Sequence, residues 1–147
     1  ITLRLGGTVD RIDAKDTTLR IVDYKTGGSP KTPANIEQLF TPSESRPNYI
    51  FQTFLYAAIM SRQQSLMVAP ALLYIHRAAS ENYSPVIEMG EPRKPKIPVN
   101  NFAFFEDEFR ERLQALLEEI FNEEEPFTQT EDTKKCSYCD FKAICKR

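Results

Sequence analysis

The order of sequence patterns predicts an α/β domain with a mixed central β-sheet flanked by helices. Two strand-like runs, residues 2–12 and 18–24, are separated by a short polar turn, which is typical of an antiparallel hairpin. A helical pattern, an apolar strand and a second helical pattern follow, and this order indicates a sheet covered by helices. The 147 residues are enough for one domain with one hydrophobic core.

The first half of the chain contains the hairpin and one helix. The turn between the two strands covers residues 13–17, and the Gly-Gly-Ser-Pro sequence of residues 27–30 ends the second strand. A loop rich in Pro, Ser and Thr then continues to residue 47. From residue 48 to about residue 63 the apolar side chains follow helical spacing: Phe51, Phe54, Leu55, Ala58 and Ile59.

The second half contains a buried strand and a long amphipathic helix. Residues 69–77 are a compact apolar strand candidate, residues 85–89 predict a shorter strand, and the Pro-rich residues 91–98 predict a loop. A helix of about 17 residues follows, since one apolar stripe runs opposite an acidic face. The stripe contains Phe105, Phe109, Leu113, Leu116, Leu117 and Ile120. Within a single domain of residues 1–147, we expect residues 128–147 to form a C-terminal linker and a Cys cluster.

Composition excludes several classes of protein. The chain has no apolar run of the ~20 residues that a membrane span needs, and it begins without a signal-peptide pattern. Three Cys are too few for a secreted disulfide scaffold, so we expect a soluble, cytoplasmic protein without a membrane partner. The absence of an initiator Met indicates that the sequence is part of a longer protein.

Charge is distributed unevenly along the chain. The net charge is −2, but residues 106–125 alone contain nine acidic residues and two Arg. The remaining residues therefore carry an excess of about five positive charges. This asymmetry is expected for a protein with one basic functional surface. By charge alone, a solvated acidic helix on an ordinary protein explains the same pattern.

Two carboxylates and a lysine predict a catalytic metal site. Asp23 and Lys25 are two residues apart on a predicted strand, so their side chains share one face. Hairpin pairing brings Asp10 beside Asp23, and with the backbone carbonyl of Tyr24 these oxygens suit Mg²⁺ or Mn²⁺. A Lys ammonium next to such a site orients water and stabilises charge on a phosphate under attack. Taken alone, an Asp-x-Lys tripeptide is more often a simple ion pair.

The surrounding residues resemble the PD-(D/E)XK superfamily, in particular its RecB/AddB-type nuclease domain. Residues 7–13 (Gly-Thr-Val-Asp-Arg-Ile-Asp) are similar to the family segment whose first Asp binds metal, a role that falls on Asp10. Residues 23–27 (Asp-Tyr-Lys-Thr-Gly) resemble a second family segment. The resemblance implies that Asp23 binds metal, that Tyr24 supplies a main-chain carbonyl and that Lys25 is catalytic. The resemblance covers residues 7–145 and implies a restriction-endonuclease-like core.

A third motif lies on the predicted helix that follows. Gln52 and Tyr56 are four residues apart and therefore share one side of the helix. The resemblance implies that this Gln-x-x-x-Tyr pair lies beside the active site and contacts DNA, and it places Arg11 near the site. Lys31, Arg46 and Arg77 are further candidates for phosphate contacts, although surface Lys and Arg are usually only solubilising. We interpret His76, the one histidine, as an ordinary strand residue.

The C-terminal cysteines predict a second metal centre. Cys136, Cys139 and Cys145 have the spacing Cys-x₂-Cys-x₅-Cys. By itself this spacing fits a zinc site that lacks one ligand, an iron–sulfur cluster that lacks one ligand, or three free thiols. The resemblance implies a [4Fe–4S] cluster whose fourth Cys precedes the nuclease core. The family's N-terminal His or Glu metal ligand is also missing from residues 1–147. We therefore expect residues 1–147 alone to contain no [4Fe–4S] cluster or an incomplete one, and to show little nuclease activity.

The combined patterns predict a divalent-metal-dependent DNA exonuclease domain. The resemblance implies membership of a larger recombination or repair protein with a helicase domain or subunit as partner. The alternative is a catalytically inactive DNA-binding or scaffolding module with the same fold. A small zinc-stabilised interaction domain is a third possibility, which requires zinc in place of iron at the Cys cluster.

Overall fold

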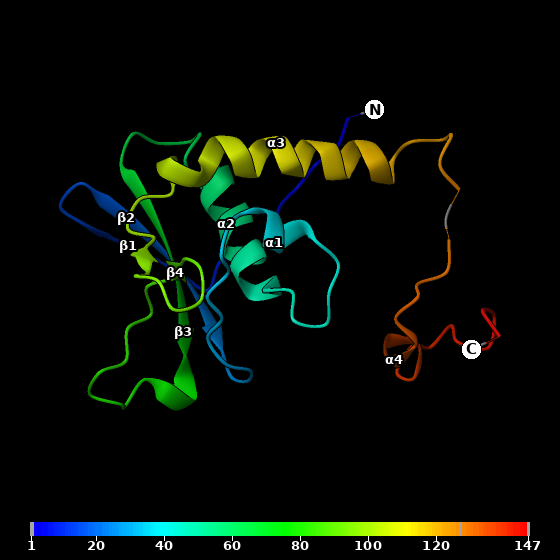
Figure 1. Cartoon of the computed structure of the whole chain (residues 1–147). Coiled ribbons are helices and arrows are strands. Elements are labelled where there is room, and N and C mark those ends of the chain that lie inside the picture. Colours follow the sequence, from blue (N-terminus) through cyan, green and yellow to red (C-terminus); the bar gives the residue numbers. More distant parts are fainter. Residues whose placement is uncertain (1, 127, 147) are drawn as a thin grey trace. The chain divides into compact units, whose positions relative to one another are not determined.

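The computed structural model describes residues 2–126 and 128–146. These residues separate into two compact units, Ile1–Leu116 and Leu117–Arg147. The first unit contains the sheet and the helices packed on it, and the second contains the end of the long helix and the Cys-rich segment (Figure 1). Within the described part of the chain, no helix has both the length and the apolar character that crossing a membrane requires.

A mixed three-stranded sheet lies at the centre of the first unit, as the sequence predicts. Its strands are β1 (Arg11–Lys15), β2 (Thr18–Lys25) and β3 (Met67–Tyr74), in the order β1-β2-β3. β1 and β2 are antiparallel, with Arg11 opposite Val22, whereas β2 and β3 are parallel, with Asp23 beside Leu72. β2 is therefore the central strand and contributes side chains to both faces of the sheet.

The hairpin is shorter than predicted. The first strand begins at Arg11, and residues 2–9 have no regular secondary structure, although the sequence predicts a strand over residues 2–12. Gly6 and Gly7 lie within this segment, and glycine weakens a strand because it has no side chain to pack. The turn is also tighter, since Lys15 pairs with Thr18 and Asp16 adopts a left-handed conformation (φ 54°) that Asp tolerates better than most residues.

Two helices follow β2. The short α1 (Glu37–Phe40) lies in the segment predicted as loop, and α2 (Asn48–Met60) confirms the first predicted helix. The carbonyl of Pro47 accepts hydrogen bonds from the backbone N–H groups of Ile50 and Phe51, so the helix begins directly after this proline. α2 lies against β2 and β3 and covers one face of the sheet (Figure 1).

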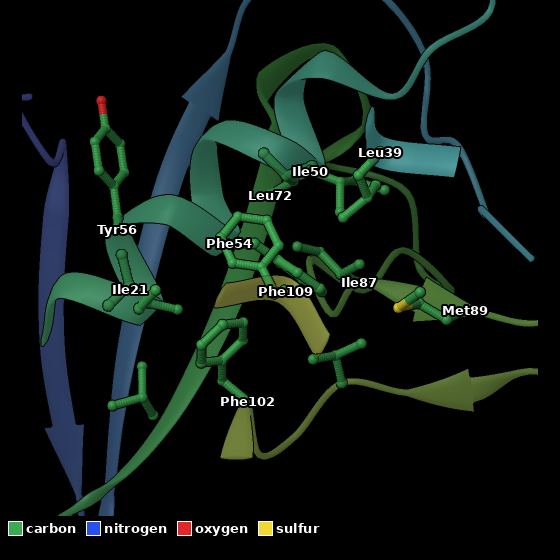
Figure 2. Close-up of a cluster of buried hydrophobic side chains, with 14 of the residues drawn as sticks. Ile21, Leu39, Ile50, Phe54, Tyr56, Leu72, Ile87, Met89, Phe102 and Phe109 are labelled. Carbon is green, nitrogen blue, oxygen red and sulfur yellow. The ribbon is translucent and has the colours of Figure 1, made fainter. Parts of the chain in front are cut away.

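The core is an aromatic cluster between α2 and the start of α3 (Ala103–Ile120). Phe54 of α2 lies 5.3 Å from the Phe102 ring and 5.8 Å from the Phe109 ring, centroid to centroid, and all three side chains are fully buried (Figure 2). The predicted stripe on α3 is confirmed for Phe105, Phe109 and Leu113, which pack in or against this core. Ile120, at the other end of the stripe, is exposed.

The segment after β3 departs from the prediction in three places. β3 ends at Tyr74, and residues Ile75–Arg77 form a 3₁₀ turn, so His76 is an exposed turn residue rather than a strand residue. The strand predicted over residues 85–89 is reduced to β4 (Glu88–Met89). β4 pairs with β5 (Ile97–Pro98), inside the segment predicted as loop. In the second unit, residues Thr133–Cys136 form the short helix α4.

Candidate active site

The face of β2 that is turned toward α2 carries a buried carboxylate–lysine pair. Asp23 is 3 % exposed, and its Oδ2 forms an ion pair with Nζ of Lys25. The same ammonium donates a 3.0 Å hydrogen bond to Oε1 of Gln52 and lies 4.3 Å from the centre of the Tyr49 ring. Three groups therefore surround Lys25, and two of them come from α2. Such contacts offset the cost of taking its charge out of water.

Oδ2 of Asp23 has one polar partner, the ammonium of Lys25. This oxygen is buried, and it lacks a further hydrogen-bond partner among the described residues. A buried carboxylate oxygen normally accepts hydrogen bonds, because desolvation without them is costly. A carboxylate with so few hydrogen bonds is the kind of ligand that Mg²⁺ or Mn²⁺ takes, so Asp23 fits a role in a metal site.

Asp10 lies at the adjacent position across the hairpin. The register that pairs Arg11 with Val22 puts Asp10 opposite Asp23, and Oδ2 of Asp10 accepts a 2.7 Å hydrogen bond from the backbone N–H of Tyr24. The structure thus brings Asp10 to the same short stretch of β2 as Asp23, as the sequence predicts. Two carboxylates are available here, and residues 2–126 and 128–146 contain no group of three or more His, Cys, Asp or Glu side chains placed to hold a metal.

Gln52 and Tyr56 of α2 continue the network away from Lys25. While Gln52 Oε1 accepts from Lys25, its Nε2 donates a 3.0 Å hydrogen bond to the Tyr56 hydroxyl. One amide therefore connects the lysine to the tyrosine and uses both of its ends. The sequence places these residues on one side of a helix, and the structure shows that this side faces the Asp-x-Lys strand.

Two participants in this site were not predicted. Tyr49 contacts Lys25, and Gly7 passes so close to Tyr56 that a Cβ added at Gly7 would lie 2.7 Å from the tyrosine hydroxyl. Tyr49 precedes Gln52 by three residues, so helical spacing already placed it on the same side of α2. Gly7 lies in the segment predicted as a strand, and its close approach becomes visible only in the folded chain.

Arg11 is not brought to this cluster. Because it is opposite Val22, its side chain belongs to the other face of the sheet, where it pairs with Asp13 at 2.8 Å. Asp13 is also held by Arg20 through two hydrogen bonds of 2.9 Å each. The contact with Arg20 lowers the pKa of Asp13, and the neighbouring Tyr24 and Asp13 raise the pKa of Arg11. Asp13, the second Asp of residues 7–13, is therefore paired with two arginines on the other face of the sheet.

The three cysteines of the second unit form no disulfide with one another. Cys139 is exposed, Cys136 and Cys145 are partly buried, and Sγ of Cys136 lies 3.9 Å from the backbone oxygen of Asp132. The described part of the chain does not gather them into a metal-binding group.

The mixed sheet with its helical cover has the restriction-endonuclease-like fold, and the carboxylate–lysine pair lies on its central strand. The chain belongs to the PD-(D/E)XK nuclease superfamily, whose family model matches residues 1–146. The superfamily assignment points to a nuclease-type hydrolase acting on DNA, in a family that generally uses divalent metals. No curated protein and no solved structure shows a significant match to the chain.

The close approach of Gly7 to Tyr56 generates a testable prediction. We expect Gly7→Ala to lower the free energy of unfolding by about 1–3 kcal/mol, as overpacking does, because the new methyl group overlaps the tyrosine ring. Chemical denaturation measures the change. Gly6→Ala is the matched control, since a Cβ at Gly6 meets nothing within 4 Å. Equal stability of the two variants would contradict the packing of the N-terminal segment against Tyr56.

Proposed function

We propose that the chain is the core of a divalent-metal-dependent DNA exonuclease of the RecB/AddB type. The observation that carries this proposal is the position of Lys25, which is held by the carboxylate of Asp23 and by Gln52 and Tyr49. The membership of the PD-(D/E)XK superfamily supports phosphodiester hydrolysis. The match of residues 7–13 and 23–27 to the RecB-type segments supports the finer assignment.

Asp10 and Asp23, with the backbone carbonyl of Tyr24, are the residues that would hold Mg²⁺ or Mn²⁺. The carboxylate of Asp23 is buried and its Oδ2 has only Lys25 as a polar partner, and Oδ2 of Asp10 accepts the hydrogen bond from the Tyr24 N–H. A divalent cation, when bound, supplies Lewis-acid stabilisation of the negative charge on the phosphate. The two carboxylates are hard-oxygen ligands of the kind that both ions prefer.

Lys25 acts on the phosphate and on the water that attacks it. In hydrolysis a water oxygen forms a bond to phosphorus, the bond to one ester oxygen breaks, and the water proton ends on the released sugar hydroxyl or in solvent. Negative charge grows on the phosphate during this step, and a positioned ammonium stabilises it. The contacts with Asp23 and Gln52 keep the Lys25 ammonium in place before substrate arrives, so little reorganisation is needed.

Gln52 and Tyr56 are proposed to position the DNA strand. Both lie on the side of α2 that faces Lys25, and their mutual hydrogen bond holds the amide in one orientation. Their spacing and order after the Asp-x-Lys strand support this role. The RecB-type resemblance further supports a place in a recombination or repair protein that works with a helicase domain or subunit.

Metal binding tests the carboxylate assignment. We expect Asp10→Asn and Asp23→Asn each to weaken Mn²⁺ binding at least tenfold, because each removes a charged ligand. Isothermal titration calorimetry with the metal alone measures this without reference to activity. Asp16→Asn makes the same chemical change in the exposed hairpin turn and should bind as the wild type does. Unchanged affinity in the exposed Asp10→Asn variant would place the metal elsewhere.

Lys25→Ala tests the chemistry itself. In the full-length protein we expect the DNA cleavage rate to fall by about 10²–10³-fold, the usual effect of removing one stabilising donor, while DNA affinity stays nearly unchanged. Cleavage rates and binding isotherms are measured on the same labelled DNA. Lys15→Ala, at the exposed end of β1, is the control. Loss of affinity in parallel with rate would assign Lys25 to binding, and a wild type that binds but never cleaves would indicate an inactive module.

The cysteines are proposed to hold a [4Fe–4S] cluster together with a fourth Cys from outside residues 1–147. Three thiolates leave one iron without a protein ligand and open to solvent. We therefore expect residues 1–147, purified without oxygen, to contain less than stoichiometric iron and sulfide and no stable cluster absorption band. A stable stoichiometric cluster would overturn this expectation, and stoichiometric zinc would favour a zinc-stabilised segment.

A further inference from the structure

We propose that the hydroxyl of Tyr74, together with Lys31 and Arg77, forms a subsite for the DNA phosphate next to the one that is cleaved. These three residues line a cavity of about 410 Å³ between the segment that follows β2 and the chain that follows β3. The inference rests on the proposed nuclease function and adds the residues that position the substrate beside Lys25.

Tyr74 lies on the same face of the sheet as Lys25. It is the last residue of β3, and the parallel register pairs it with Lys25 of β2, so both side chains lie on the side that α2 covers. Tyr74 also lines a smaller cavity together with Tyr49, whose ring contacts the Lys25 ammonium. The tyrosine is therefore next to the proposed catalytic cluster but is not used by the network that holds Lys25.

The hydroxyl of Tyr74 has no partner within the described part of the chain. The residue is 3 % exposed, yet its hydroxyl forms no hydrogen bond with residues 2–126 or 128–146, whereas a buried tyrosine O–H usually finds one. Burial, with Tyr49 and Tyr83 nearby, raises the pKa of Tyr74, so the hydroxyl keeps its proton at neutral pH and can donate it in a hydrogen bond. An acceptor bound in the cavity would supply the partner that this donor lacks.

A second tyrosine in the cavity wall holds Tyr74 in place. The hydroxyl of Tyr83 accepts a 2.6 Å hydrogen bond from the backbone N–H of Tyr74 and donates a 2.8 Å hydrogen bond to the backbone oxygen of Leu72. Both partners belong to β3, the last strand of the three-stranded sheet, so Tyr83 satisfies the backbone along the edge of that strand. The two tyrosines therefore differ in use: Tyr83 spends its hydroxyl inside the protein, and the hydroxyl of Tyr74 stays available for a ligand.

Two cations in the same wall identify the ligand as a phosphate. Lys31 is held by hydrogen bonds to the backbone oxygens of Ser45 (2.8 Å) and Arg46 (3.2 Å), and Arg77 lies exposed on the 3₁₀ turn after β3. Side chains of Lys, Arg and Tyr contact DNA phosphates, and such contacts fix the register of a strand on the protein. A strand whose scissile phosphate lies at Lys25 carries a further phosphate at each neighbouring nucleotide, so one of these can occupy the cavity.

The test removes the hydroxyl from the protein and the charge from single phosphates of the DNA. The full-length protein binds a short labelled DNA hairpin with one open end, in which one phosphate at a time is replaced by a neutral methylphosphonate. Fluorescence anisotropy in EDTA at fixed salt concentration measures the affinity without cleavage. We expect Tyr74→Phe to weaken binding of unmodified DNA about tenfold, because a hydrogen bond to a charged group is lost, and to have no effect on DNA that lacks the charge at one particular position. Arg77→Gln should show the same position dependence.

Two matched variants and a stability measurement serve as controls. Tyr138→Phe removes an exposed hydroxyl of the second unit, Arg62→Gln removes an exposed charge after α2, and both should bind every DNA as the wild type does. In chemical denaturation Tyr74→Phe should unfold at the wild-type midpoint, whereas Tyr83→Phe, which loses two internal hydrogen bonds, should unfold earlier.

The outcomes separate this subsite from the proposed nuclease function. Unchanged DNA affinity of Tyr74→Phe, an equal effect on every modified DNA, or a lowered unfolding midpoint of this variant would overturn the subsite even if the wild type cleaves DNA. Position-dependent loss of affinity in a protein that cleaves no DNA with Mg²⁺ or Mn²⁺ would support the subsite and contradict the nuclease function.

Discussion

The burial of Asp23 with Lys25 is the constraint on which the rest of the site depends. Two opposite charges on one face of a central strand lose their water, and their mutual attraction offsets that loss only if further polar contacts are supplied. α2 supplies them through the amide of Gln52 and the ring of Tyr49. The position of this helix over β2 is therefore required by electrostatics as well as by hydrophobic packing.

α2 performs two functions with two of its sides. Phe54 anchors the helix in the aromatic core with Phe102 and Phe109 (Figure 2). Gln52 and Tyr56 form the polar network next to Lys25. Asp23, Lys25 and Gln52 thus lie on a central strand and a core helix, whereas Asp10 lies just before β1. A change that shifts α2 in the core will also move the groups that hold Lys25, which links stability to the geometry of the site.

The elements that the sequence predicted well are those with strong local signals. The hairpin, α2 and α3 follow from alternation or helical spacing of apolar residues, and the Asp-x-Lys pair shares a face because strand side chains alternate. The strand predicted over residues 2–12 was wrong for its first part, since no neighbouring strand pairs with residues 2–9. The short elements α1 and β5 were missed, and β4 was predicted too long, because four or fewer residues carry too little periodicity to recognise.

The sequence by itself determined which candidate site residues share a face. The types and spacings of these residues are local properties, and strand alternation and helical geometry put Asp23 with Lys25 and Gln52 with Tyr56. Tertiary structure alone decided which groups those faces meet. The contact of Tyr49 with Lys25, the passage of Gly7 over Tyr56 and the exclusion of Arg11 from the cluster depend on strand register and on helix placement. Register and placement are set by the burial of distant residues against one another, which no single stretch of sequence contains.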